Sequence, residues 1–350
     1  MIEILNNGVV QVVLLGTVLL GIVSGILGVF TLLRKQALIG DALSHATLPG
    51  VVLMFMFTKS KEVSVLIIGA AISAGIAMLT MRIIKKYTKL QGDAILALIL
   101  SSFFGLGRFL ISLISRKPEF SKAKLDDFIF GSAATIIERD IITLLVVLVF
   151  ILVLIVLFWR QIKTQTFDAQ FYTSLGFSNE WIEFLMSFMT ILVIVSGIRS
   201  VGVILMSSLL IAPGLASRQW SHNLSINVLL SALFGAISAF VGTLISVTHP
   251  TGLPTGPVIV SVGTLIAFIS IFFAPQSGVI AKEIQRQRHR KDIQTYRSLL
   301  DVRKGFTIKD SMIDKLLKES YISLDEMGNH HLTSKGEEKV KEIVGVNYHG

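Results

Sequence analysis

Long stretches without charge dominate the first 275 residues. Stretches with no charged residue include 9–33, 63–81, 141–158, 184–198, 200–217 and 224–247. About 20 apolar residues suffice for a helix to cross the hydrocarbon core of a bilayer. With the stretches that hold few charges, the pattern predicts nine spanning helices, over about 9–33, 37–57, 63–84, 91–115, 140–159, 181–198, 200–217, 224–247 and 256–275. A broken or re-entrant segment among them would leave eight.

The composition agrees with an all-α polytopic membrane protein of eight or nine transmembrane helices. Of the 350 residues, 52% are hydrophobic and only 16% are charged, whereas soluble domains carry about 25% charged residues. The 28 glycines against 7 prolines suit membrane helices whose backbones approach closely. The chain contains no cysteine, which excludes disulfides, thiolate metal ligands and cysteine nucleophiles.

The composition changes after Pro275. The stretch KEIQRQRHRK at 282–291 is strongly basic, and residues 282–350 hold 14 Lys/Arg and 11 Asp/Glu. Basic segments beside a span normally stay in the cytoplasm and can touch anionic lipid; a charged linker facing water is the alternative. We therefore predict three regions: a membrane domain over 1–281, a basic linker over 282–306 and a small cytoplasmic domain over 307–350. Nine spans would then place the N-terminus outside.

The small domain has a pattern of α/β winged-helix type. It predicts a helix over 310–319, two short strands around Met-Gly-Asn at 327–329, and a last helix that starts with a capping box of Ser334 and Glu337. The stretch LTSKG at 332–336 resembles the wing of iron- and manganese-dependent repressors. A net charge of only +3 over residues 282–350 argues against DNA binding and favours a regulatory module. His330 and His331 are neighbours on a strand, so they point to opposite faces.

Two titratable residues interrupt the second predicted span. In LIGDALSHATLPG at 38–50, Asp41 and His45 are four residues apart and therefore share one helix face. Pro49 has no N–H to donate to the carbonyl of His45, which leaves that oxygen free. A carboxylate, an imidazole and a carbonyl suit a divalent first-row metal ion, and ionisable groups inside a membrane are functional candidates. A hydrogen bond between the two side chains that only fixes helix packing is the alternative.

The stretch LLRKQALIGDALSHATLPGVVL at 32–53 resembles the signature of permease subunits of bacterial ABC importers for manganese, zinc and iron. Further segments resemble the family in the same order: GDAILALILSSFFGLG (92–107), LDDFIFGS (125–132), SVGVILMSSLLIAPGLASR (200–218) and LPTGPVIV (253–260). The resemblance implies that Asp41 and His45 bind the transported ion and that no cofactor is held permanently. Some zinc-transporting relatives carry a histidine near Ser101 and Ser102. Its absence here favours manganese, with iron or zinc next.

The resemblance also implies partners in a bacterial cell membrane. Two permease subunits, identical or paralogous, would form the path, with a cytoplasmic ATPase and an extracytoplasmic metal-binding protein. The chain has no GxxxxGK[ST] sequence, so ATP hydrolysis must come from a separate subunit and the chain itself is not an enzyme. In a two-fold assembly, two copies of Asp41 and His45 could form a four-ligand site.

Residues 163–181, KTQTFDAQFYTSLGFSNEW, are the candidate contact with the ATPase. Asp168 can cap a short helix through Ser174, and Gly176 can end it. The segment resembles the D-x-x-x-A-x-x-x-G coupling segment of the family, with Tyr172 where a small residue is usual and Leu175 beside the glycine. An ordinary amphipathic loop is the alternative.

Two other function classes stay open on the sequence. A secondary transporter would move metal on an ion gradient without an ATPase. An intramembrane protease is the weaker alternative, because there is no HExxH sequence for a metalloprotease. The Ser-Gly pairs at Ser24 and Ser196 are weak matches in a glycine-rich chain.

Overall fold

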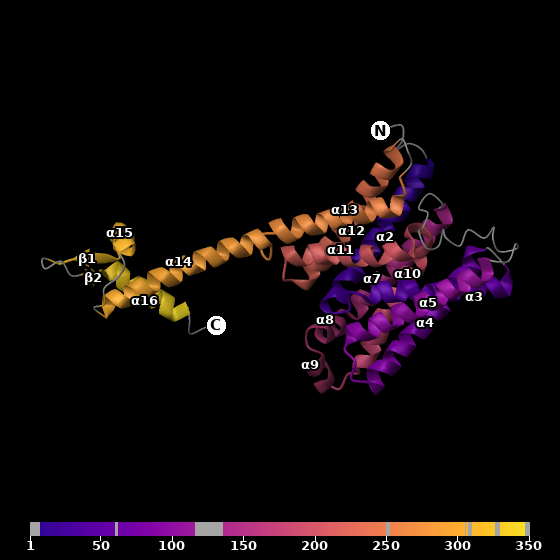
Figure 1. The fold of residues 1–350 in the computed structure, drawn as a ribbon, viewed down its shortest axis with the longest axis horizontal. Coiled ribbons are helices and arrows are strands. Elements are labelled where there is room, and N and C mark those ends of the chain that lie inside the picture. Colours follow the sequence, from indigo (N-terminus) through magenta and orange to yellow (C-terminus); the bar gives the residue numbers. More distant parts are fainter. Residues whose placement is uncertain are drawn as a thin grey trace. The chain divides into compact units, whose positions relative to one another are not determined.

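The structure is a computed structural model that describes residues 8–59, 62–115, 136–249, 253–304, 306, 310–325 and 330–346. The family-like segment 125–132 and the predicted strand turn 327–329 lie outside these residues. The chain divides after Gly278 into two compact units, a membrane unit and a tail unit, and each is described by itself (Figure 1).

The membrane unit is a bundle of long helices. These are α2 (Gly8–Leu33), α3 (Ile39–Thr58), α4 (Val63–Tyr87), α5 (Gly92–Ser115), α7 (Glu138–Leu157), α10 (Asn179–Val201), α11 (Val203–Trp220), α12 (Leu224–Thr248) and α13 (Thr255–Phe273), with the short helices α8 (Trp159–Phe167) and α9 (Ala169–Ser174) between α7 and α10. Within the described residues, eight helices are long and apolar enough to cross a membrane. The prediction of a polytopic helical membrane protein is confirmed.

The predicted span 200–217 forms α11, which is not among those eight. It has 18 residues, contains Pro213 in its interior and carries Arg218 in its last turn. Gly202, with φ of 87°, separates it from α10. A left-handed backbone of this kind suits glycine because glycine has no Cβ.

Small residues allow the helices of the bundle to pack backbone against backbone. A Cβ on Gly25 of α2 would collide with the carbonyl of Ser231 in α12, and the Ser231 hydroxyl donates to the Gly25 carbonyl at 2.7 Å. Gly50 of α3 and Gly69 of α4 are in the same relation, because a Cβ on either would collide with the other's carbonyl oxygen. Such contacts between small residues replace the hydrophobic driving force that helices lack in lipid.

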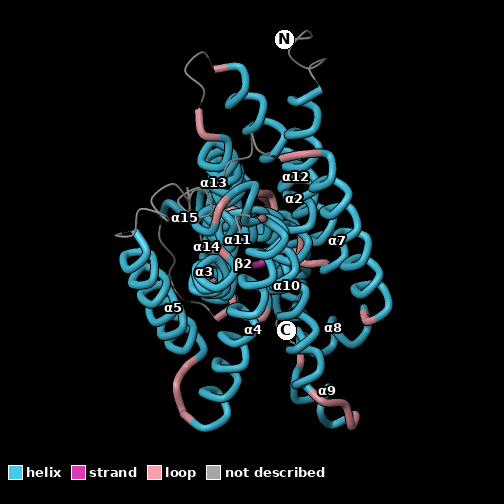
Figure 2. Tube along the Cα trace, turned by 90° about the vertical axis from the view of Figure 1, so that its right-hand side faces the viewer, coloured by secondary structure: helices cyan, strands magenta, loops and turns pink. Residues whose placement is uncertain are grey.

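One end of the bundle collects basic residues. Figure 2 shows α9 and the turn between α4 and α5 at the end opposite the first turn of α2. Arg34, after α2, shares a pocket at this end with Lys85 near the end of α4, Asp93 at the start of α5 and Glu183 in α10. The turn after α2 and the turn between α4 and α5 therefore lie close together.

The tail unit has the order helix, helix, two-stranded sheet, helix. Its elements are α14 (Val279–Arg303), α15 (Asp310–Lys318), β1 (Ile322–Leu324), β2 (His330–Leu332) and α16 (Ser334–Val346). The antiparallel strands pair Ile322 with Leu332 and Leu324 with His330. The predicted helix 310–319, the strand pair and the last helix are therefore present.

Two details of the tail differ from the predictions. The predicted linker 282–306 falls mostly within α14, and the last turns of this helix supply Leu299 and Val302 to the hydrophobic core of the tail unit. The predicted capping box is one residue out of register. Thr333, not Ser334, caps α16, because its hydroxyl accepts a hydrogen bond from the Gly336 N–H at 3.1 Å.

Candidate metal site and coupling segment

Asp41 and His45 come together near the start of α3. Asp41 lies in the first turn and His45 one turn later, so their side chains leave the same face. His45 Nε2 is 3.4 Å from Asp41 Oδ1, and the two side chains are 13% and 31% exposed, respectively. This separation is longer than a strong charge-assisted hydrogen bond of about 2.7–2.9 Å. The two atoms face each other without a tight hydrogen bond, so an ion beside the pair could be reached by both at metal–ligand distances of about 2.0–2.2 Å.

Aromatic packing fixes the orientation of the His45 ring. The ring lies edge-on to Phe104 of α5, with 4.8 Å between centroids. Its Nδ1 atom is buried without a hydrogen-bond partner among the described residues. Histidine ligands commonly donate their second ring N–H to an acceptor that sets the ring orientation. Here the contact with Phe104 supplies the orientation, and no sequence motif indicated this contact.

The helix around the pair is held closely by its neighbours. α3 continues through Pro49 as one helix, although Pro49 cannot donate to the His45 carbonyl. The Ser73 hydroxyl of α4 donates to the Ala46 carbonyl at 2.6 Å. A Cβ on Gly107 of α5 would press on Leu48 and Pro49. Contacts from α4 and α5 thus support the turn that carries His45.

One subunit alone offers few protein ligands. No cluster of three or more His, Cys, Asp or Glu side chains occurs in the part of the chain that the structure describes. Protein metal sites for first-row ions generally use at least three or four ligands. Asp41 and His45 would therefore need further ligands from water, from the backbone or from another subunit.

The predicted short helix of the coupling segment is present as α9. The Asp168 carboxylate accepts a hydrogen bond from the Phe171 N–H at 2.8 Å, which caps the helix. Gly176, with φ of 85°, follows the helix in the left-handed region. Tyr172 is only 3% exposed and stacks on Phe177 with 5.2 Å between centroids. Burial raises the pKa of the Tyr172 hydroxyl above its ordinary value.

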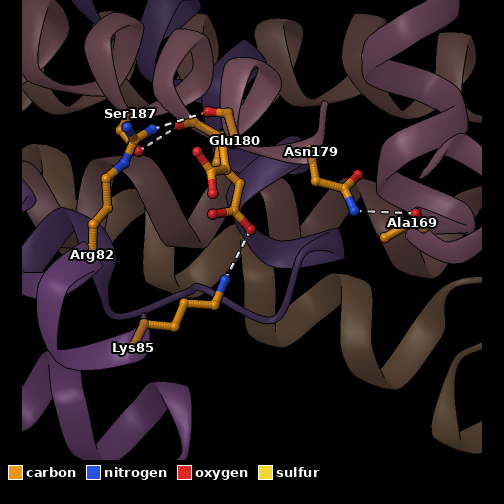
Figure 3. A network of polar contacts seen from close by, with 7 residues as sticks. Arg82, Lys85, Ala169, Asn179, Glu180 and Ser187 are labelled. Atoms are coloured by element: carbon orange, nitrogen blue, oxygen red, sulfur yellow. Dashed lines mark hydrogen bonds and ion pairs between the residues drawn. The ribbon is translucent and has the colours of Figure 1, made fainter. Parts of the chain in front are cut away.

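Large apolar side chains around α9 are left in the open. Four of these residues are each more than half exposed: Phe167, Phe171, Leu175 and Phe177. The Asn179 amide of α10 donates to the Ala169 carbonyl at 3.2 Å and ties α9 to the bundle (Figure 3). Of these four residues, the sequence predicts only Leu175 as part of the contact with the ATPase. The three phenylalanines within residues 167–177 are the sequence feature that could have indicated the rest of this surface. Exposed apolar patches of this kind indicate contact surfaces.

Comparison with known proteins identifies the class of transporter. Residues 6–274 match the ABC 3 transport family, so the chain belongs to that family. It is a multi-pass membrane permease subunit and not an enzyme. Members of this class work with an ATPase and a substrate-binding protein.

Individual relatives agree with this assignment. The zinc transport system membrane protein TroC of Treponema pallidum is 41% identical, over 82% of this chain and 96% of the relative. The manganese transport system membrane protein MntC of Bacillus subtilis is 35% identical, over 94% of this chain and 80% of the relative. An alignment that covers 94% of the chain must include most of the tail unit.

Solved structures support the fold. PsaBC from Streptococcus pneumoniae, determined in complex with a Fab, matches with a TM-score of 0.68 and 30% identity, over 79% of this chain and 96% of that one. An inward-facing putative metal-chelate type ABC transporter matches with a TM-score of 0.61 at 14% identity, which shows likeness of fold alone.

Proposed function

We propose that this chain is the permease subunit of an ATP-driven importer of divalent transition metal ions, with manganese first and zinc or iron next. The observation that carries the proposal is the Asp41–His45 pair inside a membrane helix. A carboxylate and an imidazole on one helix face suit these ions. The names of the relatives, zinc for TroC and manganese for MntC, are consistent with both metals. The serines at 101 and 102, where some zinc transporters have histidine, favour manganese.

The metal site is complete only in a pair of permease subunits. Around a two-fold axis, each copy contributes the same patch. Two Asp41 carboxylates and two His45 imidazoles then give two nitrogen and two oxygen ligands. Both side chains are partly exposed and so can contribute to a shared site, while contacts from α4 and α5 hold the turn that carries His45. A paralogous permease with an equivalent pair would serve equally well.

The segment around α9 docks the ATPase. Its capped helix is too short to be a span, and its exposed apolar side chains lie at the end of the bundle where the basic turns gather. Positive turns favour the cytoplasmic side. Asp168 and Gly176 fix the ends of the helix, Tyr172 anchors it, and Leu175 is presented to the partner.

The tail unit is a cytoplasmic regulatory module of winged-helix type. Support comes from the helix, the strand pair and the capped last helix in the expected order. On β2, His331 Nε2 lies 3.1 Å from Asp325 Oδ2, whereas His330 pairs across the sheet with Leu324. The two histidines are thus separated, so any metal sensing would use them individually.

The experiment that tests the function is transport by the reconstituted complex. The permease is inserted into vesicles with its ATPase and supplied with its binding protein, and uptake of manganese, zinc and iron is measured singly and in competition. Uptake of manganese that requires ATP is the expected result. Uptake that persists without the ATPase and follows an ion gradient would favour the secondary transporter instead.

A further inference from the structure

A pocket of about 350 Å³ opens between α3, α4, α5 and α10 at the basic end of the membrane unit. Its lining has two parts. The polar part includes Arg34, Lys35, Arg82 and Lys85 with Asp93 and Glu183, and the apolar part consists of methionine, isoleucine and leucine side chains, among them Met81. The polar part carries four positive and two negative side chains, a formal excess of two positive charges. Such a pocket repels a divalent cation, so it does not suit the transported ion.

The positive side chains of the pocket are only partly satisfied. Arg34 Nη1 is buried and has no hydrogen-bond partner among the described residues. Burial lowers the pKa of Arg34 from its ordinary value, against the favourable charge of Glu183, but a guanidinium group stays charged in proteins. A buried charged donor without a partner is costly. The geometry therefore lacks an acceptor at this point.

Two other cations are held in place with donors to spare. Arg82 Nη2 donates to the Glu180 carbonyl at 3.1 Å, and its guanidinium lies over the Phe184 ring at 5.3 Å. Lys85 Nζ lies 2.8 Å from the Glu183 carboxylate. Figure 3 shows both side chains reaching from α4 towards the first turns of α10. A guanidinium has five N–H donors, so Arg82 can hold its present partner and an additional anion.

We infer that this pocket binds an anionic phosphate group, and that the phosphate is the headgroup of an anionic phospholipid from the cytoplasmic leaflet. Arginine matches phosphate oxygens with paired hydrogen bonds. Basic pockets between membrane helices on the cytoplasmic side are typical sites for such headgroups.

The surroundings favour a lipid over a free phosphate. The methionine, isoleucine and leucine side chains of the lining provide an apolar wall that inorganic phosphate would not use. Leu79 and Ile83 of α4 are 56% and 58% exposed, so this helix has an uncovered apolar surface near the pocket. An acyl chain can lie on this apolar surface while its phosphate reaches Arg34 and Arg82.

The test counts lipids on the permease–ATPase complex. The complex is purified in neutral detergent, stripped of lipid and incubated with equal amounts of phosphatidylglycerol and phosphatidylcholine, and bound lipid is measured by native mass spectrometry. We expect one phosphatidylglycerol per permease subunit and at least about tenfold weaker binding by the Arg34→Gln/Arg82→Gln double variant. Lys89→Gln removes an exposed charge of the α4–α5 turn outside the pocket and should bind as the unchanged protein does. Equal retention of both lipids, or equal binding by the double variant, overturns the proposal.

A second variant separates the two sources of phosphate. Met81→Trp keeps all four positive charges and fills the apolar part of the pocket, so it should bind phosphatidylglycerol at least about tenfold more weakly and inorganic phosphate unchanged. This variant decides the question where the double variant does not assemble. If phosphatidylglycerol binds the unchanged protein no more tightly than inorganic phosphate, and Met81→Trp alters neither, the pocket takes a free anion and the lipid assignment is wrong.

Discussion

Different interactions stabilise the interior of the membrane unit and the interior of the tail unit. In the membrane unit, long helices meet at glycines such as Gly25 and Gly50, and hydroxyl groups such as that of Ser231 bond to the backbone of a neighbouring helix. The tail unit relies on a small core, in which Leu299, Leu316 and Val340 come from three different helices. A helix in lipid must satisfy its backbone hydrogen bonds within itself, whereas the nine-residue α15 and the two three-residue strands of the tail need contacts with other segments to be stable.

This difference also separates the functions. The family match ends at residue 274, so the membrane unit contains what the whole family shares. The tail unit lies beyond it, although the MntC alignment extends into the tail. Changes in the membrane unit should therefore abolish transport, and changes in the tail should only adjust it. The four predictions that follow test this contrast, from the largest expected effect to the smallest.

The largest effect is expected at the metal site. Asp41→Asn and His45→Ala should each reduce metal uptake by at least about a hundredfold, because loss of a ligand should cost no less than loss of a residue that only hydrogen-bonds to a ligand. Metal uptake into vesicles and copurification of the ATPase are the measurements.

The matched controls for these variants lie in the tail unit. Asp314→Asn and His289→Ala remove the same chemical groups from exposed positions and should leave uptake unchanged. Uptake within twofold of the unchanged protein in Asp41→Asn or His45→Ala, with the complex intact, would refute the metal site.

The second prediction concerns the coupling segment. Leu175→Asp should weaken association with the ATPase and lower uptake about tenfold or more. Burying an unpaired carboxylate in an apolar contact surface costs free energy, because the carboxylate loses its water. Leu324 of the tail is the matched control, since its side chain is 54% exposed and that of Leu175 is 53% exposed. Copurified ATPase and ATP-dependent uptake are measured for both variants. Full coupling in Leu175→Asp, or an equal loss in Leu324→Asp, would remove the reason to assign α9 to coupling.

The third prediction tests the glycine packing of the membrane unit. Gly50→Ala should destabilise the permease by about 1–3 kcal/mol, the usual cost of overpacking, because its Cβ would collide with the Gly69 carbonyl. Gly75→Ala is the control, because a Cβ there meets nothing within 4 Å. Thermal unfolding of the detergent-purified protein should show a drop of several degrees for Gly50→Ala only. Equal unfolding temperatures would mean that α3 and α4 can separate slightly at no cost.

Local signals in the sequence predicted much of the fold and part of the site. Eight of the nine predicted spans are helices long and apolar enough to cross a membrane, because the length and hydrophobicity of one segment decide whether it can span. Asp168 and Gly176 predicted α9 because helix capping depends on nearby residues. The cap of α16 was placed at Ser334 instead of Thr333, since adjacent hydroxyl residues look alike before the chain is folded. Phe104 beside His45, and the convergence of Arg34 with Arg82, could not be predicted, because they depend on how α5 and α4 pack against the rest of the bundle.

The smallest effect on transport is expected from removal of the tail unit. A chain that ends at Gly278 keeps every helix of the membrane unit, the Asp41–His45 pair and α9. It should therefore insert, bind the ATPase and take up metal at close to the normal initial rate. If the tail senses metal, the shortened chain should lose inhibition by metal added inside the vesicles, whereas the full chain is inhibited. Initial uptake at increasing internal manganese measures this, with the Asp314→Asn full-length protein as control. Failure of the shortened chain to assemble would show that the tail is structural, and identical inhibition of both chains would place regulation elsewhere in the complex.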